Sequence, residues 1–199
     1  AVLAKYPAAR LVCTPKAQGL LVDHLGGDAD RIQTVADGDT LSLGDRTLRF
    51  LHTPWVHWPE TMVTHLPEER ILFTCDFFGS HVATTDLYAG TGERICEAAK
   101  RYFAEIMMPF RGVIRKNLAK LEGVAFDVIA PSHGPIYDQP ECILNAYRDW
   151  VSERIANQVV IPYISMHGST ARMVDHLLGA LVERGVGAQK FELSVTDLG

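Results

Sequence analysis

Short runs of β-prone apolar residues occupy the first part of the chain, up to about residue 76. Residues 47–52 alternate between apolar and polar side chains, which is the pattern of a half-buried strand. Residues 62–65 and 71–75 are two apolar runs, and the turn-forming residues 67–70 (P-E-E-R) between them predict a β-hairpin. Further strands are predicted over residues 10–14, 33–35 and 40–43, with a helix over residues 15–25. The pattern therefore predicts five or six consecutive short strands.

From residue 91 the period of the apolar positions changes to that of helices. Residues 93–107 predict an amphipathic helix that ends at Pro109, and residues 113–121 predict a second helix. A strand is predicted over residues 127–130, and Pro140 suits the first position of a helix that reaches about residue 155. These elements and the preceding strands predict a layered α/β body over residues 1–156.

A new unit is predicted over residues 157–199. Residues 158–164 read as a buried strand, residues 170–184 as a helix with Gly185 at its end, and residues 189–195 as another strand. This β-α-β unit is the beginning of a parallel sheet. Two strands and one helix bury too little surface to be stable alone, so we expect the unit to need further structure.

Composition excludes several classes of protein. The chain has 199 residues, 47% of them hydrophobic and 22% charged, which is typical of globular proteins. A net charge of −5 without a basic stripe argues against nucleic-acid binding. The sequence predicts neither a membrane span nor a signal peptide. The opening residues resemble the end of a helix already under way, which suggests part of a longer chain.

The four cysteines are Cys13, Cys75, Cys96 and Cys142, and they form no Cys-x-x-Cys motif. Neither a zinc ribbon nor a disulfide framework is indicated by this spacing. We expect reduced, mostly buried thiols in a cytoplasmic protein.

Three residues with metal-ligand chemistry follow predicted strands. His57 lies in the loop after residues 47–52, Asp76 follows residues 71–75, and His133 follows residues 127–130. Imidazole nitrogen and carboxylate oxygen together are typical ligands of transition metals, and one carboxylate can bridge two cations. The three residues therefore predict one metal site. The alternative is structural, with His57 capping a turn and Asp76 capping the end of a strand.

A second candidate site is the loop that joins the predicted strand over residues 158–164 to the following helix. Hydroxyl groups and a glycine at such a junction suit a phosphate group, because the first N–H groups of the helix point outward. The alternative is an ordinary helix N-cap. The residues of this loop are Ser165, Met166, His167, Gly168, Ser169 and Thr170.

Three stretches together resemble a known family: residues 57–79, residues 102–110 (Y-F-A-E-I-M-M-P-F) and residues 131–137 (P-S-H-G-P-I-Y). They resemble the flavodiiron proteins, also called A-type flavoproteins, and the resemblance covers essentially the whole chain. That family joins a metallo-β-lactamase-like domain, which holds two non-haem irons, to a flavodoxin-like domain, which holds FMN. The implied fold is the C-terminal part of a metallo-β-lactamase-like αββα sandwich, followed by the start of a flavodoxin-like doubly wound parallel sheet.

The resemblance also implies roles for the candidate residues. His57 and His133 would each bind one iron and Asp76 would bridge the two, while residues 165–170 match the flavodoxin loop that holds the FMN phosphate. The family's first ligand cluster, His-x-Glu-x-Asp-His, belongs upstream of Ala1 and is absent from this sequence. Glu60 stands where family members usually have Asp. A structural role is the favoured interpretation of His81, and the alternative is a donor at the rim of the metal pocket.

The implied activity is the reduction of O2 to water, of NO to N2O, or of both. Electrons would come from a rubredoxin-like protein, a reduced flavin or deazaflavin, or an NAD(P)H-linked reductase, and they would pass through FMN. The family also implies a head-to-tail homodimer or tetramer. Two alternatives stay open: a zinc hydrolase of the lactamase fold, and a non-enzymatic FMN electron carrier. The remaining histidines are expected to be structural; they are His24, His52, His65 and His176.

Overall fold

A five-stranded mixed sheet lies at the centre of the first of two units into which the chain divides, Ala1–Ser152 and Glu153–Gly199. The computed structural model of the chain describes residues 2–90 and 93–196. The sheet has the order β3-β4-β5-β6-β7, and all neighbours are antiparallel except the parallel pair β6 and β7. Its strands are β3 (Thr40–Ser42), β4 (Thr47–His52), β5 (Met62–Leu66), β6 (Ile71–Cys75) and β7 (Val128–Pro131).

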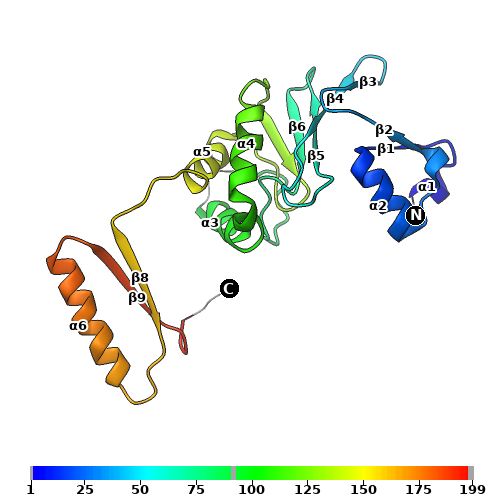
Figure 1. Cartoon of the computed structure of the whole chain (residues 1–199). Coiled ribbons are helices and arrows are strands. Elements are labelled where there is room, and N and C mark those ends of the chain that lie inside the picture. Colours follow the sequence, from blue (N-terminus) through cyan, green and yellow to red (C-terminus); the bar gives the residue numbers. More distant parts are fainter. Residues whose placement is uncertain (1, 91–92, 197–199) are drawn as a thin grey trace. The chain divides into compact units, whose positions relative to one another are not determined.

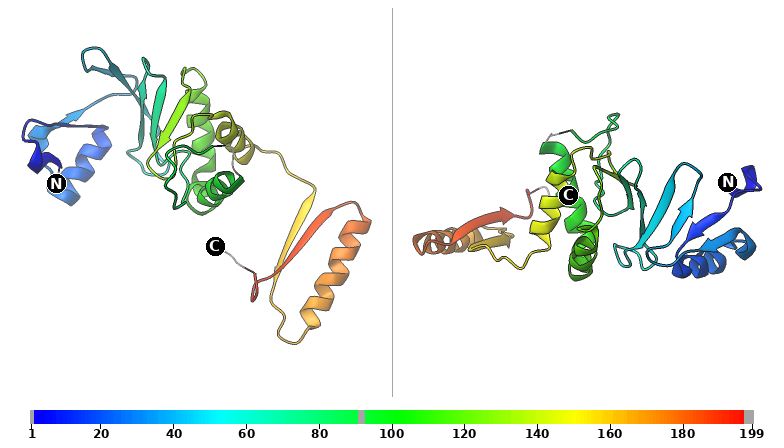
Figure 2. Two further views of the ribbon diagram at one scale, coloured as in Figure 1. Left: turned by 180° about the vertical axis from the view of Figure 1, so that it is seen from behind. Right: turned by 90° about the horizontal axis from the view of Figure 1, so that it is seen from above.

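Three helices cover this sheet from one side (Figures 1 and 2). They are α3 (Glu93–Tyr102), α4 (Arg111–Leu121) and α5 (Glu141–Trp150). The strands bury alternate residues against them, so that the core forms between the sheet and the helices. Its fully buried members include Val63, Leu72, Tyr102, Ile114, Ile129 and Tyr147.

The first residues of the chain form a small layer of their own. It contains α1 (Val2–Lys5), the parallel strands β1 (Leu11–Cys13) and β2 (Ile32–Thr34), and α2 (Pro15–Leu25) between those strands. Thr14 caps α2 by accepting from the backbone N–H of Ala17, and Gly26 ends it in the left-handed conformation. The capping residues explain why the predicted bounds of this helix are correct.

The helical segment around Pro109 differs from the prediction. Helix α3 ends at Tyr102, a π-helical turn follows over Phe103–Met107, and a 3-10 turn over Met108–Phe110 leads directly into α4. The π-helical turn ends at Met107, the predicted end of the first helix, but the chain continues in helical turns through Pro109 instead of leaving the helix there. Pro109 stands in the first turn of a new helical segment, where a backbone N–H has no partner to lose.

Helix α5 is shorter than predicted, because it ends at Trp150 rather than near residue 155. Its buried face consists of Ile143, Leu144 and Tyr147, and the next turn adds Val151. Ile155 is 95% exposed, so no core contact continues the helix beyond this point.

The expectation of mostly buried cysteines was also wrong. Only Cys13 is buried, whereas Cys75, Cys96 and Cys142 are exposed. Cys75 lies on the face of β6 that points away from the core, and the other two lie on α3 and α5.

The second unit consists of β8 (Gln158–Tyr163), α6 (Ser169–Glu183) and β9 (Gly187–Glu192). The two strands are parallel and pair over all six residues, as predicted for a β-α-β unit. Val174 is the one buried hydrophobic side chain in the described part of this unit, and Met173 and Val160 are 73% and 61% exposed. The predicted boundary at residue 157 lies between α5 and β8, and the predicted end at residue 199 lies outside the described residues.

None of the helices in the described part of the chain has the length and hydrophobicity needed to cross a membrane.

Candidate metal centre

The three predicted ligand residues meet at one edge of the central sheet. Strands β6 and β7 are parallel, so the residues that follow them lie at the same edge. Strand β4 is antiparallel to β5, which is antiparallel to β6, so β4 also ends there. His57 follows β4, Asp76 follows β6 and His133 follows β7. The strand directions alone thus explain why residues so far apart in sequence become neighbours.

Asp76 contacts both imidazoles through different oxygen atoms. His57 Nε2 lies 3.1 Å from Asp76 Oδ2, and His133 Nε2 lies 3.3 Å from Asp76 Oδ1. The Asp76 side chain is 15% exposed, compared with 24% for His57 and 49% for His133. The carboxylate is therefore the inner member of the cluster, and the imidazoles reach it from two sides.

This arrangement is not by itself a closed site for a single ion. Within residues 2–90 and 93–196, no group of three or more His, Cys, Asp or Glu side chains is placed to hold one metal ion. The two imidazoles are linked only through opposite oxygens of Asp76. The role of the three residues as metal ligands stays a prediction.

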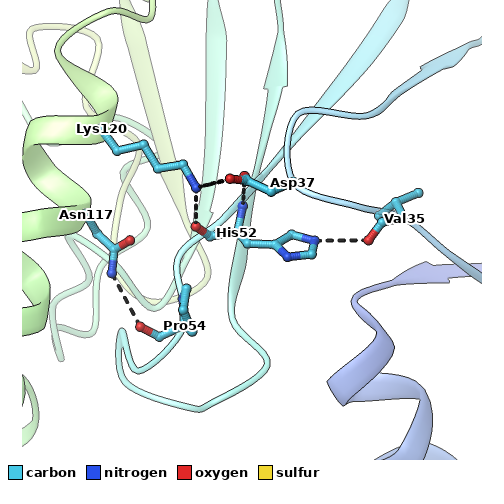
Figure 3. Close-up of polar contacts among 6 residues, drawn as sticks. All are labelled: Val35, Asp37, His52, Pro54, Asn117 and Lys120. Carbon is cyan, nitrogen blue, oxygen red and sulfur yellow. Dashed lines mark hydrogen bonds and ion pairs between the residues drawn. The ribbon is translucent and has the colours of Figure 1, made fainter.

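Helix α4 holds both ends of the segment that leads to His57 (Figure 3). Lys120 Nζ donates to the His52 carbonyl oxygen at 2.8 Å, and Asn117 Nδ2 donates to the Pro54 carbonyl oxygen at 3.3 Å. Lys120 also contacts both oxygens of Asp37, which accepts from the backbone N–H of His52. These contacts fix the backbone just before the loop that carries His57.

The loop itself is closed by backbone hydrogen bonds. Thr53 N–H donates to the Thr61 carbonyl at 2.9 Å, and Trp55 N–H donates to the Trp58 carbonyl at 2.7 Å. Val56 is completely buried beneath it. His57 is therefore presented by a rigid turn.

A tight turn positions Asp76. Cys75, the residue before it, has a φ of 53°, in the left-handed region that non-glycine residues seldom adopt. The Thr74 hydroxyl donates to the Phe77 carbonyl at 2.7 Å, and the Phe78 N–H donates to the Tyr147 hydroxyl at 3.2 Å. Because Thr74, Phe78 and Tyr147 are fully buried, the turn cannot relax without breaking buried hydrogen bonds.

The His133 loop packs against the same turn. Ser80 N–H donates to the His133 carbonyl oxygen at 3.1 Å, and Ser132 N–H donates to the Cys75 carbonyl at 2.7 Å. Gly134 has a φ of +83°, and a Cβ atom there would lie 2.1 Å from Ser80 Oγ. Only glycine fits this position without displacing its neighbours.

Tyr102 and His81 line the inner side of the candidate site, next to His133. Tyr102 of α3 is 1% exposed, and its ring lies 4.7 Å from that of His81 and 6.1 Å from that of His133. Burial, followed by the negative charge of Asp76, holds the pKa of Tyr102 well above its usual value. The His81 ring lies 5.8 Å from the His133 ring, which places it beside the cluster.

Aromatic side chains also flank His57. Its ring lies 5.7 Å from that of Trp58 and 6.3 Å from that of Phe110, and Phe110 stacks with Trp55 at 6.2 Å. Trp55 and Trp58 are 49% and 57% exposed. The outer side of the site is therefore an exposed aromatic surface.

Two of the other histidines make contacts within the fold, and two are exposed on helices. His52 is in β4 and its Nε2 contacts the Val35 carbonyl at 3.0 Å, while His65 is buried in β5 with its Nε2 3.0 Å from the Ala125 carbonyl. Burial lowers the pKa of His65. His24 and His176 lie on exposed faces of α2 and α6. Glu60 has one carboxylate oxygen buried without a hydrogen-bond partner among the described residues.

The predicted phosphate loop joins β8 to α6. Gly168 has a φ of +79° at the N-cap of α6, and nothing lies within 4 Å of the position of a Cβ atom there. Ser165 Oγ accepts from the Ala171 N–H at 3.1 Å, and the Ser165 N–H donates to Glu192 Oε1 at 3.0 Å. Ser165 therefore braces the loop, while the residues that follow it stay open to solvent.

The sequence did not point to the residues that support the ligand loops. Tyr102, Asn117, Lys120 and Tyr147 all lie on helices, and their partners lie tens of residues away in sequence. The one available signal is that Asn117 and Lys120 stand three residues apart, so they share a face of α4.

A sheet covered by helices, with candidate ligands from three loops at one edge, defines a metallo-β-lactamase-like protein. The chain belongs to the ODP family of β-lactamase-like proteins, whose family model matches residues 2–134. The comparisons below also confirm the resemblance to flavodiiron proteins and, with it, the predicted fold class of this part.

Among similar proteins, nitric oxide reductase of Moorella thermoacetica is 37% identical over an alignment of 203 positions, gaps included. The alignment covers 99% of this chain and 51% of that protein. The flavodiiron protein of Giardia intestinalis is 31% identical, with a TM-score of 0.87, over 97% of this chain and 48% of that one. Rubredoxin oxygen:oxidoreductase of Desulfovibrio gigas is 27% identical, with a TM-score of 0.85, over 94% and 48%. The chain thus spans about half the length of these relatives.

Proposed function

We propose that this chain belongs to a flavodiiron oxidoreductase that reduces O2 to water, NO to N2O, or both, with electrons delivered through FMN. The observation that carries the proposal is the Asp76 carboxylate between two imidazoles, each facing a different oxygen. The similar proteins support it, because one is named for nitric oxide and another for oxygen.

The donor set fits a pair of irons. A carboxylate that offers one oxygen to each side is the usual bridge between two cations, and imidazole is a common ligand of iron. His57 and His133 would each hold one iron, and Asp76 would bridge them. When bound, the irons supply open coordination positions and electrons for a diatomic substrate.

The protein groups around this position control protons and water. Because burial and Asp76 raise its pKa, Tyr102 keeps its proton on the phenol oxygen at physiological pH. Trp58 and Phe110 flank His57 and restrict the approach of water from that side. His81, next to His133, offers ring nitrogens for hydrogen bonds at the rim of the site.

The loop of Ser165, Met166, His167, Gly168, Ser169 and Thr170 would hold the FMN phosphate. Its fit rests on its position at the N-terminus of α6 and on the open space at Gly168. In this proposal the second unit, from about residue 157, is the beginning of a flavodoxin-like domain. FMN would accept two electrons and release them singly.

The proposal extends to partners and location. The exposed aromatic surface beside His57 suits the approach of a flavin from another subunit, which agrees with a head-to-tail homodimer or tetramer. The electron donor would be a rubredoxin-like protein, a reduced flavin or deazaflavin, or an NAD(P)H-linked reductase. We place the protein in the cytoplasm.

Metal analysis of the full-length protein tests the proposed binding of iron by His57, Asp76 and His133. We expect two irons per chain, and loss of iron with retention of flavin in His57→Ala, Asp76→Asn and His133→Ala. His24→Ala is the matched control, because this histidine is exposed on α2, and it should retain both cofactors. Two zinc ions without flavin would instead support a hydrolase.

A charge substitution tests the proposed binding of the FMN phosphate by residues 165–170. Thr170→Glu places a carboxylate in the first turn of α6, where it favours the helix but repels a phosphate. The variant should lose FMN and keep iron, which is the opposite pattern to Asp76→Asn. Retention of FMN in Thr170→Glu would refute the assigned phosphate loop. A protein that holds FMN but consumes neither O2 nor NO when reduced would be an electron carrier.

A further inference from the structure

Two cysteines that the proposed chemistry does not use lie side by side on the surface of the first unit. Cys96 is in α3 and Cys142 is in the first turn of α5, and their Sγ atoms are 3.2 Å apart although 46 residues separate them in sequence. Both residues are exposed, and the structure contains them as thiols. A small pocket adjoins the pair, and its wall includes Ile95, Tyr137 and Trp150.

We infer that Cys96 and Cys142 form a redox-active dithiol, which a low-molecular-weight disulfide such as oxidised glutathione converts to an intramolecular disulfide. One thiolate attacks the external disulfide, forming a mixed disulfide and releasing one small thiol. The second cysteine then attacks the mixed disulfide and releases the other small thiol. The protein loses two protons and two electrons, and one external disulfide takes them up to become two thiols, so the exchange balances.

The geometry favours closure. A disulfide has an S–S distance of about 2.05 Å, so the two Sγ atoms, now 3.2 Å apart, need to approach by only about 1.2 Å. Helices α3 and α5 already pack against each other, so the approach requires side-chain rotation more than movement of the helices. Exposure of both residues gives an external disulfide access to either sulfur.

The other two cysteines lack this arrangement. Cys13 is buried in β1, and its thiol has a raised pKa because of burial. The sulfur of Cys75 faces a carboxylate oxygen of Asp76 at 3.8 Å rather than a second sulfur. A raised pKa lowers the fraction of reactive thiolate. Selective oxidation at Cys96 and Cys142 is therefore expected.

Closure would join the two helices that support the candidate metal centre. Tyr102 of α3 lies against His133, and the Tyr147 hydroxyl of α5 accepts the hydrogen bond from the Phe78 N–H, beside Asp76. A covalent link between α3 and α5 restrains both supports at once. This consequence for the metal centre rests on the proposed function, whereas the exchange chemistry does not.

Oxidation of the full-length protein tests the dithiol directly. After incubation with oxidised glutathione, peptide mapping should recover Cys96 joined to Cys142, with a mass lower by two hydrogen atoms and restored by dithiothreitol. Cys13→Ala should behave as the wild type. Cys96→Ser and Cys142→Ser should instead carry glutathione on the one remaining cysteine of the pair. Glutathione on both cysteines of the wild type, or two unmodified thiols, would overturn the inference.

Thermal unfolding and hydrogen exchange test whether the disulfide restrains α3 and α5. Closing the loop between the two cysteines should raise the midpoint of thermal unfolding by about 5–10 °C and slow amide hydrogen exchange in α3 and α5. Neither change should occur in Cys96→Ser under the same oxidant. Since these measurements need no metal or flavin, they can succeed even if the proposed function fails. An oxidised wild type with unchanged exchange in both helices would show that the bond does not restrain them.

Discussion

The two candidate sites of this chain are held in very different ways. The metal-ligand loops of the first unit rest on buried groups from α3, α4 and α5, including Tyr102, Asn117 and Tyr147. The phosphate loop of the second unit is braced mainly by Ser165, in a unit whose described part buries a single hydrophobic side chain, Val174. One site is built by packing between distant elements, and the other by a local turn.

This difference has a physical consequence. A site fixed by buried contacts keeps its geometry without its ligand, because relaxation would leave buried polar groups unpaired. A site fixed by a local turn depends on its ligand, or on neighbouring structure, for order. We therefore expect substitutions near His133 to cost stability, and equivalent substitutions near Gly168 to cost mainly ligand binding.

The largest expected difference comes from a matched pair of glycines. Gly134 and Gly168 have nearly the same backbone conformation, with φ of +83° and +79°, but only Gly134 has a neighbour where a Cβ would lie. Gly134→Ala should destabilise the first unit by about 2–4 kcal/mol, through strain and the clash with Ser80. Gly168→Ala should cost about 1 kcal/mol, from strain alone.

Hydrogen exchange measured separately for residues 125–140 and 160–175 would report the two effects. Equal protection losses in the two variants would show that the crowding at Ser80 does not matter.

A smaller effect is expected from removing one buried hydroxyl. Tyr147→Phe leaves the Phe78 N–H without its acceptor in the core, at a cost of about 2 kcal/mol. Urea unfolding followed by tryptophan fluorescence measures this cost in the first unit, because all three tryptophans lie there. Tyr6→Phe, at a ring 54% exposed, is the control and should leave the transition in place. An unchanged transition for Tyr147→Phe would mean that another group replaces the lost acceptor.

The smallest expected difference is in the stability cost of replacing two lysines of similar exposure. Lys120 in the first unit and Lys190 in the second each pair with an aspartate, and their side chains are 32% and 39% exposed. Lys120 also donates to the His52 carbonyl, so Lys120→Met should cost about 1 kcal/mol. Lys190→Met should cost less than Lys120→Met, because an exposed ion pair contributes little to stability. Equal costs in thermal unfolding would show that the link to β4 adds nothing.

The ion pair between Lys120 and Asp37 also predicts that stability depends on pH. Burial alone would raise the pKa of Asp37, but Lys120 and the His52 N–H outweigh it and hold the pKa below its usual 3.8. A lowered pKa in the folded state means that the carboxylate stabilises the fold fully above about pH 5 and progressively less as the pH falls toward about 3. In Lys120→Met this loss between the two pH values should shrink. Urea midpoints at both pH values measure it, and an unchanged slope would contradict the assignment.

Much of the fold could be predicted because local signals agreed with the final packing. The bounds of α2, β4 and β6 match the predicted ranges exactly at Pro15–Leu25, Thr47–His52 and Ile71–Cys75. Capping residues and alternation with a period of two mark these elements in the sequence itself. The segment around Pro109 could not be predicted, because proline either ends a helix or begins one, and only tertiary contacts decide between them.

Some features of the candidate site could be predicted from the sequence, and others could not. His57, Asp76 and His133 could be placed together because each follows a recognisable strand, and strand direction carries the rest. The proximity of Cys96 to Cys142 could not be predicted, since it depends on how two helices pack.

The π-helical turn over Phe103–Met107 makes the position of Tyr102 sensitive to chain length. Such a turn contains one residue more than a regular helical turn and occurs frequently at functional sites. Deleting a single residue there would restore regular winding and rotate everything upstream by roughly 100° about the helix axis. Tyr102 would then leave His133, so relatives with a shorter segment at this point would need a different residue to line the inner side of the candidate site.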